Sequence, residues 1–374
     1  MHAAPDISAD NGPRERRRVM MIAPHFEEYA YLLARGIAEA DDVLLVLDTT
    51  ILEREYKGRH RPAAPHVAIR SNRFRSPLDL LWLIVAILRF RPQVIHWQEP
   101  SGLVKAMMAV IVVTFCRSFA TVALTIHDPV PHHGRDARTA RRLALFRRYA
   151  RYRVHRLFVH GVSCRAQYLS AYLPAPHVDT RVVLTDHGVI LAADADRRPE
   201  ALVSALMFGR MERYKGLGVL CDAVELLAGQ GQTIPLALAG HGPELDALET
   251  RFACHSSVRI DRRFVAAADL IAMIQAAHCV LLPYTGATQS GVLAAAFANG
   301  RFVIASRVGG IADVVEHGVN GLLVPPGDAR ALADALLAVA ADEALRERLC
   351  EGARRTAVDR LCWSKIAAEM AACY

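Results

Sequence analysis

The sequence predicts an α/β protein built from two doubly wound parallel-sheet domains, and three observations support this prediction. Apolar runs of strand length alternate with helical patterns along the chain, which is typical of parallel sheets covered by helices on both faces. The length of 374 residues suits two domains of ordinary size. An acidic, alanine-rich segment at 192–200 separates the two sets of runs and has the composition of a linker.

The first half of the chain is expected to form one sheet with helices between its strands. Apolar runs predict strands at 18–24, 43–48, 94–97, 120–127, 156–160 and 181–185. Helical patterns predict helices at 29–39, 78–89, 104–115, 137–151 and 164–172. Arg91-Pro92 ends the second of these helices, because proline does not continue a helix.

The second half repeats this architecture without a detectable sequence period. Strands are predicted at 201–208, 234–239, 258–260, 279–282, 302–305 and 321–324. Helices are predicted at 218–228, 244–251, 267–276, 291–298 and 329–340, with a helical tail at 342–374. The resulting boundaries are a flexible basic N-terminus at 1–17, a first domain at 18–191, the linker at 192–200, a second domain at 201–358 and a final helix at 359–374.

The composition indicates a globular protein of a reducing compartment. Hydrophobic residues make up 53% of the chain and charged residues 22%. None of the eight cysteines forms a C-x-x-C pair, so zinc ribbons and redox motifs are not expected. The longest apolar runs, 78–88 and 107–115, are shorter than the ~20 residues of a spanning helix, and no apolar signal segment precedes Arg18. We therefore expect a cytoplasmic protein that is not integral to a membrane.

The net charge of +7 is concentrated in the first half. Residues 1–200 hold 29 Lys+Arg and 20 Asp+Glu, whereas residues 201–374 hold 16 and 18. Arginines from Arg135 to Arg156 alternate with apolar side chains, which predicts a basic amphipathic helix on an anionic membrane surface. An arginine-rich helix that simply faces solvent is the alternative, and nucleic acid is not expected as a partner.

The segment 208–216 is the most informative in the chain. The apolar run at 201–208 ends at Gly209, and Arg210 and Lys215 follow at a spacing of five before a helical pattern begins. A strand, a glycine turn and a helix N-terminus form an anion-binding site in open α/β sheets. Two fixed cations at this place suit a diphosphate leaving group that no metal ion accompanies.

Four segments follow one another in the order and at the spacings of a known family. They are Phe208–Gly216, Leu282–Tyr284 with Ala287–Val292, Phe302–Val315 with its Gly309-Gly310 pair, and Asn320–Asp328. His127-Asp128 after an earlier strand and Asp186-His187-Gly188 at the end of the first domain add to the pattern. The chain resembles the GT-B-fold glycosyltransferases of family four, the retaining group that uses nucleotide sugars. The resemblance covers most of 94–374 and is dense from 201 to 328.

The resemblance implies two Rossmann-like α/β domains that face a cleft, with the donor site in the second domain and the acceptor site in the first. It implies catalytic roles for His127, which would contact the donor sugar, and for Arg210 and Lys215, which would hold the diphosphate. It implies donor contacts from Gly209, Gly216, Arg262, Phe264, Gln289, Ser290, Gly291 and Val292. His187 and Gly188 would lie at the interdomain crossover, and the tail around Trp363 would cross back onto the first domain.

This chain departs from the family pattern in two places. Two glutamates about seven residues apart are usual in the donor loop, whereas Gly286 or Ala287 and then Ala295 hold their positions here. Gln289 and Ser290 would then take over the role of the missing carboxylates. A glycine pair often follows the first strand, and this chain has Pro24–Glu28 instead.

We therefore expect a retaining, metal-independent hexosyltransferase with no cofactor besides its substrate, a GDP- or UDP-hexose. The expected acceptor is a glycan, lipid-linked as in surface or exopolysaccharide assembly, reached by a peripheral protein at the inner face of the cell membrane. The alternative is a catalytically inactive glycosyltransferase-like partner subunit, which the missing glutamates motivate and the retained cations Arg210 and Lys215 oppose. An epimerase of the same fold would need carboxylates that the donor loop does not offer.

Overall fold

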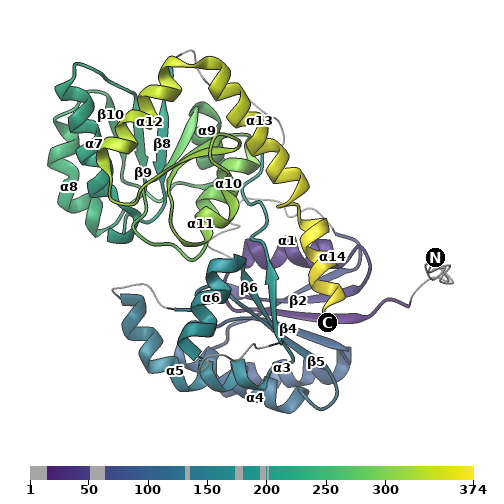
Figure 1. The fold of residues 1–374 in the computed structure, drawn as a ribbon. Coiled ribbons are helices and arrows are strands. Elements are labelled where there is room, and N and C mark those ends of the chain that lie inside the picture. Colours follow the sequence, from purple (N-terminus) through teal and green to yellow (C-terminus); the bar gives the residue numbers. More distant parts are fainter. Residues whose placement is uncertain (1–14, 51–63, 131–134, 173–179, 194–198, 200–201) are drawn as a thin grey trace, which may run out of the picture.

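The computed structural model describes residues 15–50, 64–130, 135–172, 180–193, 199 and 202–374, without the side chains of 135–141. Two parallel sheets lie one above the other, and the C-terminal helices run down one side of both (Figure 1). Most of the predicted linker at 192–200 lies outside the described residues.

The N-terminal sheet has seven strands in the order β3-β2-β1-β4-β5-β6-β7. The strands are β1 (Arg18–Ala23), β2 (Asp42–Asp48), β3 (Val67–Asn72), β4 (Val94–Gln98), β5 (Thr121–Ile126), β6 (Arg156–His160) and β7 (Val182–Thr185). Its helices are α1 (Glu27–Ile37), α3 (Pro77–Phe90), α4 (Leu103–Cys116), α5 (Arg135–Arg153) and α6 (Gly161–Tyr172). Apolar side chains of α3, α4 and α6 pack on one face of this sheet, and those of α1 pack on the other.

The C-terminal sheet has six strands in the order β10-β9-β8-β11-β12-β13. The strands are β8 (Ala205–Phe208), β9 (Leu236–Ala239), β10 (Val258–Asp261), β11 (Cys279–Leu282), β12 (Phe302–Ser306) and β13 (Gly321–Val324). Its helices are a short 3-10 turn η1 (Arg213–Lys215), α7 (Leu217–Gly229), α8 (Pro243–Ala253), α9 (Ala267–Ala276), α10 (Gly291–Ala298), α11 (Gly309–Val314), α12 (Ala329–Ala341) and α13 (Glu343–Asp359). The predicted doubly wound α/β class is confirmed by these two sheets.

Besides the short turn η1, two elements were not predicted, for identifiable reasons. Strand β3 lies at the edge of its sheet and exposes three of its six side chains, so its apolar run is only Val67–Ile69. Helix α11 begins at Gly309-Gly310, a pair that suggests only a turn in the sequence. A Cβ atom on Gly310 would lie 2.1 Å from the carbonyl oxygen of Thr288, so glycine allows this helix to approach the 285–290 loop closely.

The C-terminal helix α14 (Trp363–Ala372) leaves the second domain and packs against α1 of the first. The indole Nε1 of Trp363 donates a hydrogen bond of 2.7 Å to the carbonyl of Val189. Just before α14, the guanidinium of Arg360 forms hydrogen bonds of 2.8 and 2.9 Å with the two carboxylate oxygens of Asp186. The chain therefore connects the two domains twice, at the linker and at this crossing.

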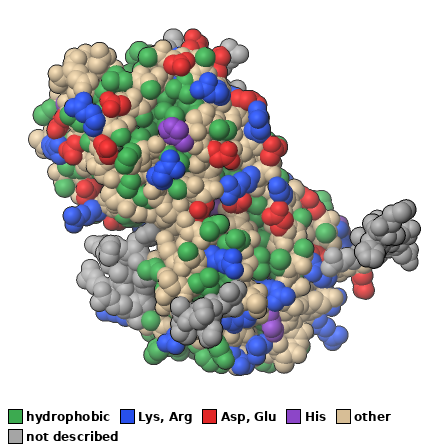
Figure 2. All heavy atoms as spheres, viewed as in Figure 1, with side chains coloured by type: hydrophobic (Ala, Val, Ile, Leu, Met, Phe, Trp, Pro, Cys, Tyr) green, Lys and Arg blue, Asp and Glu red, His purple; other side chains and the backbone are tan. Residues whose placement is uncertain are grey.

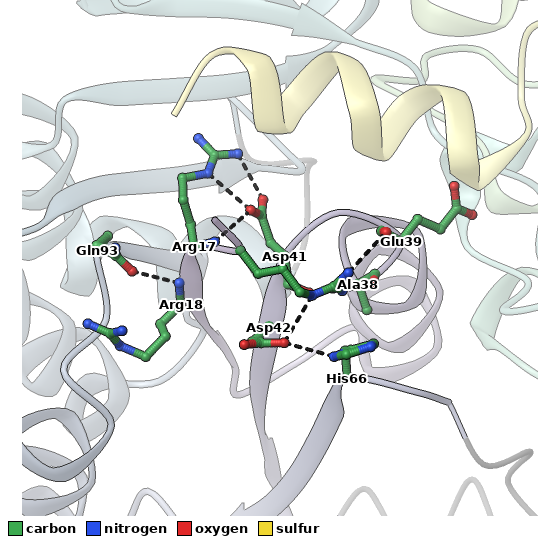
Figure 3. Close-up of polar contacts among 9 residues, drawn as sticks. Arg17, Arg18, Ala38, Glu39, Asp41, Asp42, His66 and Gln93 are labelled. Atoms are coloured by element: carbon green, nitrogen blue, oxygen red, sulfur yellow. Dashed lines mark hydrogen bonds and ion pairs between the residues drawn. The ribbon is translucent and has the colours of Figure 1, made fainter. Parts of the chain in front are cut away.

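A polar network fixes the first strand beneath α14 (Figure 3). The guanidinium of Arg17 binds the buried carboxylate of Asp41 at 2.8 Å and donates to the carbonyl of Ala371 in α14. Asp42 accepts from Arg16 and pairs with His66 at the start of β3. Because Arg17 satisfies both Asp41 and the end of α14, the helix position is tied to the sheet.

Among the helices that the structure describes, none combines the length and the apolar character needed to span a bilayer.

Replacing Gly188 by alanine should lower the free energy of unfolding by about 1–3 kcal/mol, the usual cost of overpacking a well-filled site. The reason is that a Cβ atom there would lie 2.4 Å from the indole ring of Trp363. Urea unfolding of four proteins, the wild type, Gly188→Ala, Trp363→Phe and the double variant, measures the coupling between positions 188 and 363. The cost of Gly188→Ala should shrink in the Trp363→Phe background, and equal costs in both backgrounds would contradict this contact.

Candidate active site

The turn after β8 places two cations at the carboxyl edge of the C-terminal sheet. Gly209 has φ 106° and lets the chain leave the strand, and Arg210 follows it on the surface. Lys215 ends η1 with a side chain only 6% exposed, and its Nζ lies 5.1 Å from the ring centroid of Tyr284. Burial, with a smaller contribution from the nearby charge of Arg210, lowers the pKa of Lys215 to about 8.

The N-terminus of α10 faces the same place from the next strand of the sheet. Ser290 caps this helix, because its side chain accepts a hydrogen bond of 3.2 Å from the amide of Leu293. The remaining first-turn amides have no partner within the helix, and the helix dipole adds positive potential at that end. The strand end, the cations and the helix N-terminus thus converge on one point.

A cavity of about 160 Å³ occupies this point. It is lined by Arg210, Tyr214, Lys215, Tyr284, Ala287, Thr288, Gln289, Ser290, Gly291 and Val292 of the C-terminal domain and by Asp128 of the N-terminal domain. The structure therefore brings together most of the residues for which donor binding was predicted. Gly209 and Gly216 flank the turn that carries the two cations, and a Cβ on Gly209 would lie 3.0 Å from Lys215 Nζ.

Asp128 connects the two domains at this cavity. It follows β5, and its Oδ1 accepts a hydrogen bond of 2.5 Å from the hydroxyl of Thr288. The thiol of Cys164 in α6 donates to the carbonyl of Thr288 at 3.0 Å. The donor loop is therefore held from the opposite domain through one residue.

His127 lies buried behind this loop and does not line the cavity. Its Nε2 is 2.9 Å from Gln98 Oε1, and its Nδ1 is 3.4 Å from Gln289 Nε2. These partners assign the neutral ring with its proton on Nε2, and burial holds the pKa of His127 well below its usual value. Phe26 stacks on the ring at 3.8 Å between centroids. His127 reaches the loop through Gln289.

Histidines from neighbouring strand ends gather beside His127 around one tyrosine. Tyr29 of α1 lies 5.4 Å from His160 and 5.3 Å from His187 between ring centroids. The ring of Trp363 completes this group at 4.9 Å from Tyr29. His187, predicted for the crossover, accordingly packs where α14 meets the first domain.

Two predicted donor contacts lie away from the cavity. Arg262 follows β10 and binds two carboxylates of α8, those of Asp246 and Glu249. Phe264 is 68% exposed to solvent. Neither side chain lines the cavity that Arg210 and Lys215 share.

The sequence interpretation missed several residues of this region. Phe26 occupies the place of the usual glycine pair and adopts a left-handed conformation with φ 59°, which turns the chain over His127. Asp313 of α11 reaches across to α6, where it accepts hydrogen bonds of 2.9 Å from the amide and 3.0 Å from the hydroxyl of Ser163. Asp313 lies within one of the four family segments, so the sequence singled out this stretch but did not indicate the contact with α6.

Within the described residues, no group of three or more His, Cys, Asp or Glu side chains is arranged to hold a metal ion. The histidine group around Tyr29 is held by ring packing instead.

Residues 203–342 match the family model described as glycosyl transferases group 1. The phosphatidyl-myo-inositol mannosyltransferase of Mycobacterium tuberculosis is 34% identical over 194 residues, which are 49% of this chain and 50% of that protein. The chain thus spans about half the length of the curated relatives it matches. The predicted family resemblance is confirmed for the C-terminal domain.

Solved structures match along nearly the whole chain. Sucrose-phosphate synthase of Thermosynechococcus elongatus superposes with a TM-score of 0.73 at 19% identity, covering 96% of this chain and 98% of that one. The Anabaena protein HepE in complex with UDP-glucose superposes with a TM-score of 0.70 at 17% identity, covering 96% and 99%. These matches confirm the predicted fold of two Rossmann-like domains in the GT-B arrangement.

The free energy of unfolding should fall as the pH is lowered from about 6.5 to 5. Burial lowers the pKa of His96 and His160 to about 3 and of His25 and His187 to about 4. In this pH range these histidines therefore bind protons in the unfolded chain but not in the folded chain. Each of them changes the free energy of unfolding by about 1.4 kcal/mol per pH unit. Urea unfolding between pH 7.5 and 5 measures the slope.

A His160→Gln variant should reduce that slope by about one histidine's share. An identical slope in the variant would show that His160 does not titrate as its burial requires.

Proposed function

We propose that this chain, whose residues 203–342 belong to the glycosyl transferases group 1 family, transfers a hexose from a nucleotide diphosphate sugar to a glycan acceptor. One observation carries the proposal: Arg210, the buried Lys215 and the N-terminus of α10 line the same cavity at the carboxyl edge of a parallel sheet. This arrangement suits a diphosphate, because two cations and free amides converge where negative charge develops. The UDP-glucose complex of HepE, which shares the fold, supports a nucleotide-sugar donor.

The leaving group would be stabilised by this chain's own cations, without a metal ion. Glycosyl transfer passes through an oxocarbenium-like state in which charge accumulates on the departing diphosphate. Lys215 is held by its packing on Tyr284, so little reorganisation is needed as that charge grows. With retention of configuration, the departing phosphate takes the proton of the acceptor hydroxyl on the same face, and no protein nucleophile is required.

Gln289 would bind the donor sugar in place of the usual glutamate. Its Nε2 is directed to His127, whereas its Oε1 is buried without a hydrogen-bond partner among the described residues. A buried acceptor of this kind costs about 1–3 kcal/mol when unsatisfied, and a sugar hydroxyl donating to it would remove that cost. His127 then acts as a positioning residue for Gln289.

Asp128 would supply the carboxylate that the donor loop lacks. It lines the cavity from the opposite domain, next to Thr288, and no acidic residue lies between Tyr284 and Asn299. A carboxylate at this position can accept a hydrogen bond from a sugar or acceptor hydroxyl, and it is in place only when the two domains meet.

The acceptor would be a lipid-linked glycan in surface or exopolysaccharide assembly, met at the cytoplasmic face of the membrane. The name of the mycobacterial relative, a phosphatidyl-myo-inositol mannosyltransferase, supports a lipid-bearing acceptor. All eight cysteines are free thiols, which suits a reducing compartment. The second candidate, an inactive partner subunit, rests on the absence of the glutamate pair.

A calorimetric panel of UDP-, GDP- and ADP-sugars tests the donor site. One nucleotide should bind selectively at pH 7, and its affinity should weaken as the pH rises through about 8, where the free enzyme's Lys215 loses its charge. Lys215→Arg should bind with little pH dependence, and Lys215→Ala should lower turnover by about 10²–10³-fold. EDTA should leave turnover unchanged.

Binding of none of these donors would favour the inactive-subunit candidate. Normal turnover of Lys215→Ala would show that Lys215 does not stabilise the diphosphate.

Asp128→Asn should lower kcat far more than Thr288→Ala does. Both variants weaken the hydrogen bond between the two residues, but only the first removes the carboxylate from the cavity. A fall of about 10²-fold is expected if the carboxylate contacts the reacting sugars. Steady-state kinetics with saturating donor measure kcat of both variants. Equal losses of kcat would show that Asp128 acts only through its hydrogen bond to Thr288 of the other domain.

A further inference from the structure

Helix α3 is apolar on both of its faces. Leu83 and Ile87 are buried against the sheet, as expected. The opposite side exposes a second stripe at helical spacing, formed by Leu78 (75% exposed), Leu81 (57%), Trp82 (37%), Val85 (37%) and Leu88 (55%). A helix face that only contacts water has no reason to carry such a stripe.

Helices α4 and α5 continue this apolar surface. The exposed side chains of α4 and the turn after it are Leu103, Val104, Met107, Ile111, Phe115 and Phe119. On α5 they are Leu145, Tyr149 and Tyr152, which also share one helical face. The hydroxyl of Thr114 donates to that of Tyr149 at 3.3 Å, so the stripes of α4 and α5 adjoin. We call the exposed side chains of these three helices the apolar face.

The charges around the apolar face are almost entirely positive. Between Val67 and Phe119 the exposed charged residues are Arg70, Arg73, Arg75, Arg89, Arg91 and Arg117. The acidic residues of that stretch are occupied within the protein: Asp79 caps α3, and Glu99 is buried against Arg151. Arg142 and Arg148 add exposed positive charge on α5. Figure 2 shows basic and apolar side chains intermixed at the lower end of the molecule.

This charge pattern changes the expectation for the arginine-rich helix. Arg151 is buried and forms two hydrogen bonds with Glu99, and Arg156 donates to the carbonyl of Cys373. These two arginines therefore stabilise the fold and cannot face a membrane. The side chains of 135–141 lie outside the described residues.

We propose that the apolar face docks on an anionic lipid bilayer, with the α3, α4 and α5 stripes against the acyl boundary and the surrounding arginines among the phosphate headgroups. Exposed leucine, tryptophan and phenylalanine side chains partition into that boundary, and arginine binds phosphates. Helices α3 and α4 pack on one face of the sheet, and α5 packs against α4, so the three stripes lie at the same end of the molecule. The exposed charged residues of the 67–119 stretch are all basic, and this charge suits an anionic surface. A neutral or basic protein partner would not require such a surface to lack acidic groups.

The position of α4 relates this surface to the candidate active site. Its first residue, Leu103, is exposed, and two residues earlier Ser101 contacts His25 beside the turn that covers His127. A lipid-linked acceptor in the bilayer would thus lie close to the cleft. This relation rests on the proposed transferase function, whereas docking itself does not.

Liposome flotation of the full chain tests the docking. The protein should float with vesicles of phosphatidylcholine and phosphatidylglycerol and remain behind with phosphatidylcholine alone, and 0.5 M salt should weaken flotation several-fold. Leu81→Asp/Leu88→Asp should reduce bound protein at least tenfold. The matched control is Val358→Asp on α13, an exposed valine (67%) of the other domain, which should float like the wild type.

Trp82 provides a readout that does not depend on mutating the stripe. Vesicles with brominated acyl chains should quench Trp82 fluorescence, and Trp82→Phe should lose this quenching while it still floats. The reason is that Trp97 is buried in the sheet and Trp363 is half-buried at the junction with α14, away from the apolar face. Equal flotation of the aspartate variant and the wild type, or no quenching, would overturn the proposal. Light scattering provides the other contradicting outcome. If the wild type is a dimer and Leu81→Asp/Leu88→Asp is a monomer, the apolar face binds a second copy of this chain and not a bilayer.

Donor calorimetry on the same variants separates this proposal from the proposed function. Normal donor binding without flotation in the aspartate variant would leave the transferase site standing, and flotation without any donor binding would support docking alone.

Discussion

The functional contacts of this molecule depend on two parallel sheets that meet at their carboxyl ends. A parallel strand delivers the residue after it to the same edge as its neighbours do, so each sheet collects polar side chains along one edge. Here β5 delivers His127 and Asp128, and β8 delivers Arg210. The hydrogen bond between Asp128 and Thr288 is the point at which the two edges touch in the cavity.

The sequence was sufficient for the sheet class and for the cations, because both depend on local signals. Apolar runs predict central strands, and the position of Arg210 and Lys215 after a strand end predicts that both cations lie at one edge of the sheet. Lys215 and Arg210 line one cavity at this strand end, as their spacing suggests, whereas the packing of Lys215 on Tyr284 was not predicted. Edge strand β3 was not predicted because half of its side chains are exposed and its apolar run is short.

Contacts between segments that are distant in the chain could not be derived from one sequence. Nothing local tells that Phe26 would cover His127, or that Arg262 would bind α8 and not face the cavity. The same holds for Asp128, whose contribution to the donor loop depends on how the second domain is placed. The donor loop, which has no acidic residue, therefore forms only one side of the cavity, and the carboxylate of Asp128 lies on the other.

The hydrogen bonds that Ser163 donates to Asp313 mean that the N-terminus of a helix in one domain is capped by a carboxylate of the other. A side-chain cap stabilises a helix by about 0.5–2 kcal/mol. When the domains separate, the first turn of α6 loses this cap and should fray, so its amides would exchange with solvent more readily. Domain opening and local melting of α6 are then one equilibrium, and whatever holds the cleft shut also orders that helix.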